Sequence, residues 1–131
     1  MISVAYVDAD AHISLMVCLL CQRQGGITMH AFTSGHEALK ILSHTPVDVI
    51  ISEYDMPGMN GIELLATLRS QGDLTPFILF TGIADTRKII QAMSRYPAVR
   101  ILSRRSTVQE QFPRLVMMIR MAAQHSAVRR G

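Results

Sequence analysis

The sequence predicts an α/β domain built on one five-stranded parallel sheet with helices on both faces. Short apolar runs rich in Ile and Val alternate with segments of helical periodicity about five times along the chain. The connections are short, so each helix carries the chain from one parallel strand to the next in the right-handed sense. The strand order that satisfies these rules is 2-1-3-4-5, the doubly wound order of the flavodoxin-like fold.

The first strand–helix–strand unit is the clearest part of this pattern. Ile2–Val7 is a short apolar strand, and Ala11–Gln24 carries an apolar stripe at helical spacing. The helix is expected to stop at Gly25 and Gly26, because glycine is typical of helix ends. Ile27–Phe32 then predicts the second strand.

The next segment contains a helix, a buried strand and another helix. Ser34 can cap a helix that runs to about residue 44, with Glu37 three residues later in the capping-box position. Val47–Ser52 is apolar almost throughout, as expected for a strand that is covered on both faces. Gly61–Gln71 predicts the third helix, which ends at Gly72.

The last third of the chain completes the sheet. Pro76–Phe80 predicts the fourth strand, and Asp85–Tyr96 predicts a fourth helix that ends at Pro97. Val99–Ser103 is a short fifth strand, and Gln109–Gln124 is the last helix. Five strands and five helices therefore account for almost the whole chain.

The composition is that of one globular domain with an aliphatic core. The chain has 131 residues, of which 49% are apolar and only 5% aromatic. A chain of this length can bury a stable core without disulfide bonds or metal ions. We expect one domain over residues 1–125 and a flexible tail over residues 126–131. No apolar run approaches the roughly 18 residues that span a bilayer, and the N-terminus lacks the charged start of a signal peptide. A cytoplasmic protein without a membrane partner is expected.

The cysteines and histidines offer little chemistry on their own. Cys18 and Cys21 have the C-x-x-C spacing, but they lie near the end of a predicted helix, whereas reactive pairs lie at helix N-termini. Buried structural thiols are therefore favoured over a redox pair. The five histidines are scattered over separate elements without the spacing of metal ligands.

Charge is distributed unevenly along the chain. Residues 1–84 carry three basic and eight acidic side chains, whereas residues 85–131 carry ten basic and two acidic ones. One interpretation is a solvated surface on the last helices. The other is a docking face for an acidic partner or, more weakly, for nucleic acid. No helix-turn-helix or zinc-finger pattern supports direct reading of DNA.

Two acidic residues follow strands that are neighbours in the predicted sheet. Asp8 comes directly after the first strand and Glu53 directly after the third. In this strand order the ligand crevice lies at the carboxyl ends of strands one and three. We therefore expect both side chains to lie at one crevice.

Three stretches of the sequence match a known pattern. The segment from Glu53 to Gly61 reads Glu-Tyr-Asp-Met-Pro-Gly-Met-Asn-Gly, Thr81 lies within Phe-Thr-Gly, and Asp8 ends the first strand. Over about residues 2–124 the chain resembles response-regulator receiver domains. The resemblance implies a signalling module of a two-component phosphorelay, whose partner is a histidine kinase or another signalling protein.

The resemblance also implies a phosphorylation site, and the chain departs from it. In the family an aspartate four residues before the proline accepts the phosphoryl group. Two adjacent acids hold Mg²⁺, and a lysine and a hydroxyl grip the phosphoryl oxygens. Here Glu53 stands at the phosphoacceptor position, Ala9 replaces the second acid beside Asp8, and Arg104 replaces the lysine. Thr81 matches the hydroxyl position.

Three further positions bear on the same chemistry. Asp10 either substitutes for the lost acid or caps the first helix, and the cap is favoured. Asp55 matches a position that offers a backbone carbonyl to the metal, so Asp8 and Asp55 are at most weak metal ligands. Ile101 stands where the family places an aromatic switch residue that is coupled to Thr81.

The two charged substitutions suit each other. The carboxylate of Glu53 reaches about 1.5 Å farther than that of an aspartate, beyond the position that an in-line attack requires. The planar guanidinium of Arg104 matches a carboxylate bidentately. We therefore expect a Glu53–Arg104 pair that closes the crevice, with Arg105 as a competitor. Glu53 is then either a mimic of the phosphorylated residue or a passive replacement.

The sequence therefore predicts a degenerate receiver that works without phosphorylation, is not an enzyme and needs no cofactor. One alternative is a working but atypical phosphoacceptor, which would bind Mg²⁺. A second is a basic scaffold that binds an acidic protein or nucleic acid. The resemblance also implies a homodimer through the fourth helix, fifth strand and last helix, with Met117 and Met121 as an adaptable rim.

Overall fold

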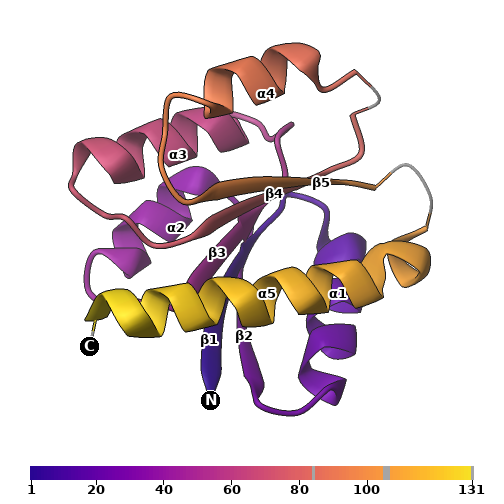
Figure 1. Ribbon diagram of the computed structural model, residues 1–131. Coiled ribbons are helices and arrows are strands. Elements are labelled where there is room, and N and C mark those ends of the chain that lie inside the picture. Colours follow the sequence, from indigo (N-terminus) through magenta and orange to yellow (C-terminus); the bar gives the residue numbers. More distant parts are fainter. Residues whose placement is uncertain (84, 105–106, 131) are drawn as a thin grey trace.

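Five parallel strands form one sheet in the order β2-β1-β3-β4-β5, which confirms the predicted order (Figure 1). The computed structural model describes residues 1–83, 85–104 and 107–130, and the side chains of these residues except 108 and 127–130. The strands are β1 (Ile2–Val7), β2 (Ile27–Phe32), β3 (Val49–Ser52), β4 (Phe77–Thr81) and β5 (Val99–Ser103).

Helices cover both faces of the sheet, with α1 and α5 on one face and α2, α3 and α4 on the other (Figure 1). The helices are α1 (Ala11–Arg23), α2 (Gly35–Leu42), α3 (Gly61–Ser70), α4 (Arg87–Met93) and α5 (Val108–Arg130). In the described part of the chain, none of the helices combines the length and the hydropathy that a membrane span requires.

The core consists of two apolar clusters, one on each face of the sheet. Ala5 and Val7 of β1 belong to the cluster under α2, α3 and α4, whereas Val4 and Tyr6 belong to the cluster under α1 and α5. This alternation follows from the period of two along a strand. All four side chains are fully buried, so β1 is covered on both faces as a parallel strand should be.

The cysteines belong to the α1 side of this core. Cys21 is fully buried, and burial raises the pKa of its thiol to about 12. Cys18 is half-buried, and burial raises the pKa of its thiol as well. The structure confirms the predicted buried thiol for Cys21, whereas Cys18 is only partly buried. A thiol with a raised pKa is a poor nucleophile, so neither cysteine supports a redox pair.

Side-chain caps fix where two of the helices begin. The Ser34 hydroxyl accepts a hydrogen bond from the backbone N–H of Glu37 at 3.1 Å, as predicted for the start of α2. The Glu37 carboxylate accepts from the hydroxyl of Thr33 at 3.3 Å instead of closing the expected capping box. A complete capping box is found at α3, where Asn60 and Glu63 each bind the backbone N–H of the other.

The central strands are displaced slightly from their predicted limits. β3 begins at Val49, two residues later than expected, because the carboxylate of Asp48 accepts the Ser3 N–H at 2.8 Å where a ladder bond would lie. β4 extends through Thr81, one residue farther than predicted. The hydroxyl residue is therefore part of the strand and not of the loop after it.

The last two helices also differ from prediction. α4 starts later than the predicted Asp85, because the Asp85 carboxylate accepts the backbone N–H of Arg87 at 3.2 Å and holds a turn before the helix. α5 continues past the predicted end at Gln124 to Arg130, since no proline or glycine interrupts this stretch. Residues 126–130, expected as a tail, therefore have a helical backbone, and the flexibility of this end stays a prediction.

Gly61, the first residue of α3, lies against the end of β3. A Cβ at this position would come within 2.5 Å of the Glu53 carbonyl oxygen and 2.7 Å of a Leu79 methyl group. The Gly61 N–H donates to the Tyr54 carbonyl oxygen at 2.8 Å. The loop after β3 thus returns so closely that it has no room for a side chain, which fixes the backbone at Glu53.

We expect Gly61→Ala to lower the free energy of unfolding by about 1–3 kcal/mol, because a backbone carbonyl cannot move aside. Gly35→Ala is the matched control. Gly35 also begins a helix, but its Cβ would meet the flexible end of Met59, 2.8 Å from the sulfur. Chemical denaturation of both variants measures the difference. Equal stabilities would show that the contact between the loop and β3 is loose.

Candidate functional site

The carboxyl ends of the strands surround an open crevice of about 560 Å³. The register pairs Val7 with Ser52 and Thr81 with Ser103, so the residues that follow each strand meet at the same edge of the sheet. The residues that line the crevice are Asp8, Ala9, Asp10, Ile13, Glu53, Asp55, Gly82, Ile83 and Arg104. The expected meeting of Asp8 and Glu53 is therefore confirmed.

The guanidinium of Arg104 lies between two buried carboxylates. One terminal nitrogen forms an ion pair and hydrogen bond with Glu53 Oε2. The other lies 3.8 Å from Asp8 Oδ2 and has no hydrogen-bond partner among the described residues. The side chains of Arg104, Glu53 and Asp8 are only 11%, 8% and 4% exposed. The expected pair is present, but the bidentate geometry is not, because the guanidinium is shared between the two acids.

The surrounding structure fixes the position of Arg104. Its backbone N–H donates to the Thr81 carbonyl oxygen at 2.7 Å, which continues the ladder between β4 and β5. Its guanidinium carbon lies 5.2 Å from the centre of the Phe80 ring, a cation–π distance. A Cβ on Gly82 would lie 3.4 Å from a guanidinium nitrogen. The side chain is thus enclosed between the aromatic ring, the glycine and the two acids.

Glu53 is bound through its carboxylate and its backbone. Its Oε1 accepts the backbone N–H of Tyr54 at 2.6 Å, while Oε2 faces Arg104. Its own N–H donates to the Val7 carbonyl oxygen at 3.0 Å, and its carbonyl oxygen accepts the Ser52 hydroxyl at 2.8 Å. Both carboxylate oxygens are therefore engaged inside the crevice.

Asp8 is held by a residue that the sequence analysis did not single out. Its Oδ2 accepts the Tyr6 hydroxyl at 3.1 Å, and its Oδ1 accepts the backbone N–H of Asp10 at 2.9 Å. Burial raises the pKa of the Asp8 carboxyl and also that of the Tyr6 phenol, where the negative charge of Asp8 adds to the effect. Tyr6 of β1 lies two residues before Asp8, which follows the strand, and that spacing was the available signal.

The other predicted positions have clear places. Asp10 caps α1, since its carboxylate accepts the backbone N–H groups of the second and third helix residues, which confirms the favoured interpretation. Asp55 is exposed at the crevice.

Thr81 is fully buried below the crevice, and its hydroxyl accepts the N–H of Ile83 at 3.2 Å. Ile101 packs against the cluster under α4. Arg105, the expected competitor, lies outside the described residues.

A sequence model of the response regulator receiver domain matches residues 4–115. The chain belongs to this family. Among solved structures, the receiver domain of an HD-domain protein from Pseudomonas fluorescens is 29% identical, with a TM-score of 0.81, and covers 96% of this chain and 97% of that one. The response regulator domain of Thermotoga maritima CheB shares the fold with a TM-score of 0.84 at 24% identity, over 95% and 97% of the two chains.

Related sequences are longer than this receiver. The transcriptional regulatory protein MalR of Bacillus subtilis is 30% identical over 100 residues, which cover 76% of this chain and 42% of that protein. The DNA-binding transcriptional regulator NtrC of Salmonella typhimurium is 33% identical over 67 residues, which cover 51% and 14%. The matched segments therefore span less than half the length of these two relatives.

The side chains in the crevice of this receiver do not fit the Mg²⁺ that the family implies. Among the described residues, no cluster of three or more His, Cys, Asp or Glu side chains could hold a metal ion. Ala9 offers no side-chain oxygen, both oxygens of Asp8 accept hydrogen bonds, and Glu53 binds Arg104. Mg²⁺ requires a nearly octahedral set of oxygens, and here a guanidinium occupies the space between the two acids.

We expect Arg104→Met to lower the free energy of unfolding by about 3–5 kcal/mol, because two buried carboxylates lose their only counter-charge within the described crevice. Adding Glu53→Gln should recover part of the loss. Arg87→Met is the control, since the Arg87–Asp85 pair is exposed on both sides and such pairs contribute little. Urea denaturation of these variants, of the Glu53→Gln single variant and of the wild type measures the coupling, and additive effects of the two crevice changes would contradict the pair.

We expect the stability of the Asp8→Asn variant relative to wild type to rise as the pH increases from about 4 towards neutrality. Burial raises the pKa of Asp8 above its ordinary value of 3.8. In that window the folded state binds more protons than the unfolded chain, so this carboxyl makes folding less favourable as the pH rises. Denaturation at a series of pH values gives the difference in unfolding free energy between the variant and the wild type. A flat or opposite trend would contradict the raised pKa of Asp8.

Proposed function

We propose that this receiver domain is a signalling module that acts through protein–protein contacts and does not run the Mg²⁺-dependent phosphorylation cycle. The observation that carries the proposal is the guanidinium of Arg104 between Glu53 and Asp8. A tethered cation there offsets part of the negative charge of the crevice without a metal, and it remains attached to the chain. On this proposal the domain performs no catalysis of its own and is not an enzyme.

Glu53 is poorly placed to act as a phosphoacceptor. Its carboxylate lies one methylene farther out than that of an aspartate, and a misplacement of about 1 Å can slow an in-line reaction on the order of 100-fold. Its two oxygens are engaged by Arg104 and by the Tyr54 N–H. Attack on a phosphoryl donor would therefore require the buried ion pair to open first.

The same interactions support a single fixed conformation. The ion pair joins the end of β3 to the end of β5, and the Arg104 N–H ties the latter to the Thr81 carbonyl. Ile101, which stands at the aromatic switch position, is half-buried in the core. We propose that Glu53 acts as a permanent charge in place of a phosphorylated side chain, held by Arg104, and that partners read this state.

The proposed partners are a histidine kinase or another signalling protein. MalR and NtrC are named as transcriptional regulators, and the matched segment is only part of each. From this similarity we propose that the domain controls a regulatory protein, which it either contacts or forms part of. The homodimer through α4, β5 and α5, which the resemblance to receiver domains implies, also stays a prediction.

Intact-mass spectrometry after incubation with Mg²⁺ and acetyl phosphate tests the proposal. The variant Ala9→Asp/Glu53→Asp/Arg104→Lys restores the family residues at three positions and is the positive control. We expect the variant to gain a phosphoryl group and the wild type to gain none. Phosphorylation of the wild type on Glu53 or Asp55 would contradict the proposal and support the working, atypical phosphoacceptor.

A further inference from the structure

The layer formed by α1 and α5 carries most of the exposed large apolar side chains of the molecule. These two helices lie side by side over one face of the sheet and contact each other (Figure 1). Nine large apolar side chains are exposed among the described residues, and four of them belong to four other segments. Single exposed apolar side chains are common, whereas a group of them indicates a binding surface. Five belong to the two helices: Leu15, Met16, Leu19, Met117 and Met121.

The helix α1 is apolar on two opposite sides. Val17 and Cys21, one turn apart, are fully buried in the core against the sheet. Leu15 and Leu19 are also one turn apart but lie on the other side of the helix, and they remain 60% and 52% exposed. A helix on the surface of a protein normally presents polar side chains to water on that side. The outer side of α1 therefore suits an apolar partner.

The helix α5 extends the same surface. Ile119 is fully buried, whereas Met117 and Met121, two residues away on either side, are 62% and 58% exposed. The guanidinium of Arg120 donates to the Gly25 carbonyl oxygen at 3.4 Å, which joins α5 to the turn after α1. The five exposed apolar side chains of the two helices thus belong to one surface, which we call the α1–α5 face.

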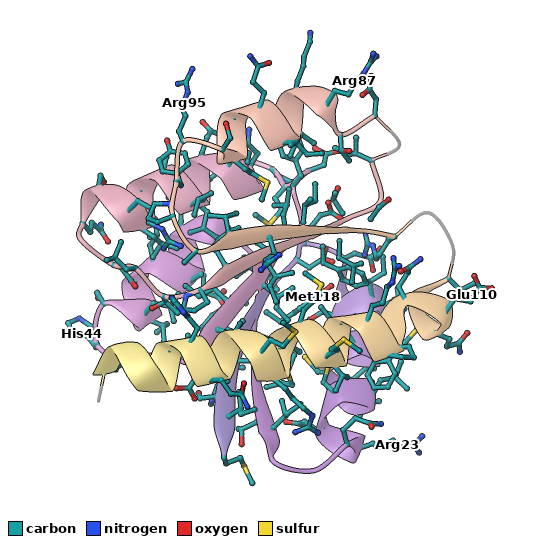
Figure 2. The ribbon with its side chains drawn as sticks, in the orientation of Figure 1. Arg23, His44, Arg87, Arg95, Glu110 and Met118 are labelled. Carbon is teal, nitrogen blue, oxygen red and sulfur yellow. The ribbon has the colours of Figure 1, made fainter. Side chains whose placement is uncertain are left out.

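The charges on the α1–α5 face are almost all positive. α1 contains no acidic residue, and Glu110 in the first turn is the single acid of α5. Arg23 at the end of α1 and Arg114 and Arg120 on α5 are exposed, and Figure 2 shows Arg23 extending outward from the molecule. No ion pair involves these three arginines within the described residues. The face therefore offers positive charge to a partner together with apolar side chains.

This combination selects the occupant. A second copy placed face to face would bring the arginines towards their own equivalents, and like charges in an interface are unfavourable. Nucleic acid would pair with the arginines but would gain little from leucine and methionine, because single strands bind through aromatic stacking. Protein interfaces are centred on side chains that fill pockets, and Leu15, Met16 and Leu19 line neither the crevice nor the cavity beside β5. A lipid surface takes up protruding apolar side chains singly and supplies negative charge around them.

We propose that the α1–α5 face binds the surface of a membrane that contains anionic phospholipids. Leu15 and Leu19 enter the boundary between headgroups and acyl chains, while Arg23 and Arg114 pair with lipid phosphates at its surface. The proposal departs from the expectation of no membrane partner, which rested on the lack of a spanning segment. It is independent of the crevice, because none of the side chains named for it touches Glu53 or Arg104 in the described structure.

Co-sedimentation of the full chain with lipid vesicles tests the proposal. One set of vesicles contains equal parts of phosphatidylglycerol and phosphatidylcholine, and the other contains phosphatidylcholine alone. We expect the wild type to bind the anionic vesicles about tenfold or more tightly than the others, and added salt to weaken this binding. Leu15→Gln/Leu19→Gln and Arg23→Gln/Arg114→Gln should each weaken it about tenfold or more.

Two variants are matched controls. Ile41→Gln/Leu74→Gln removes two apolar side chains that are 41% and 44% exposed on other segments. Arg95→Gln removes a positive charge that is exposed on α4 and points outward there, on the other side of the sheet (Figure 2). Both controls should bind as the wild type does, and thermal melting confirms that each variant folds.

Three results would overturn the proposal. The first is no binding of the wild type to anionic vesicles, and the second is an equal loss of binding in the controls and in the variants of the α1–α5 face. The third is a wild-type dimer in analytical ultracentrifugation that Leu15→Gln/Leu19→Gln dissociates, which would assign the face to a second copy of the chain.

Discussion

The guanidinium of Arg104, enclosed by Glu53, Asp8 and the ring of Phe80, is the interaction on which the site depends. Two carboxylates that are almost fully buried within one crevice would repel each other and remain poorly solvated without a cation. In receiver domains, a reversibly bound Mg²⁺ is expected to provide this positive charge. Here the cation is part of the chain, so the counter-charge of the two carboxylates is built into the fold.

The sheet supplies the precision that this arrangement needs. Parallel register brings the residues after β1, β3 and β5 to one edge, and the glycine at the start of α3 presses the returning loop against Glu53. Tyr6 holds Asp8 from below, on the same face of β1. A buried charge network of this kind contributes little to stability beyond what an apolar core would. On the proposed function, its consequence is a defined conformation that partners recognise without a chemical switch.

Much of the fold and part of the site could be predicted from the sequence. The strand order follows from alternating periodicity, and the meeting of Asp8, Glu53 and Arg104 follows from parallel strands that end at one edge. Tyr6 was missed although its position two residues before Asp8 was a signal in the sequence, whereas the role of Phe80 depends on a side-chain distance that no pattern of residue types fixes. The shared, rather than bidentate, guanidinium depends on the same distances. The start of α4 was misplaced because the Asp85 side chain competes for a backbone N–H, which helix periodicity does not reveal.

In the crevice of this receiver, a guanidinium stands where the family implies a metal. A crystal structure of the wild-type chain grown with Mn²⁺ and beryllofluoride tests this arrangement, because anomalous scattering locates the metal. We expect Arg104 to bind Glu53 and no anomalous peak to lie in the crevice. A Mn²⁺ ion bound by Asp8 and Asp55, with Arg104 turned out to solvent, would contradict it.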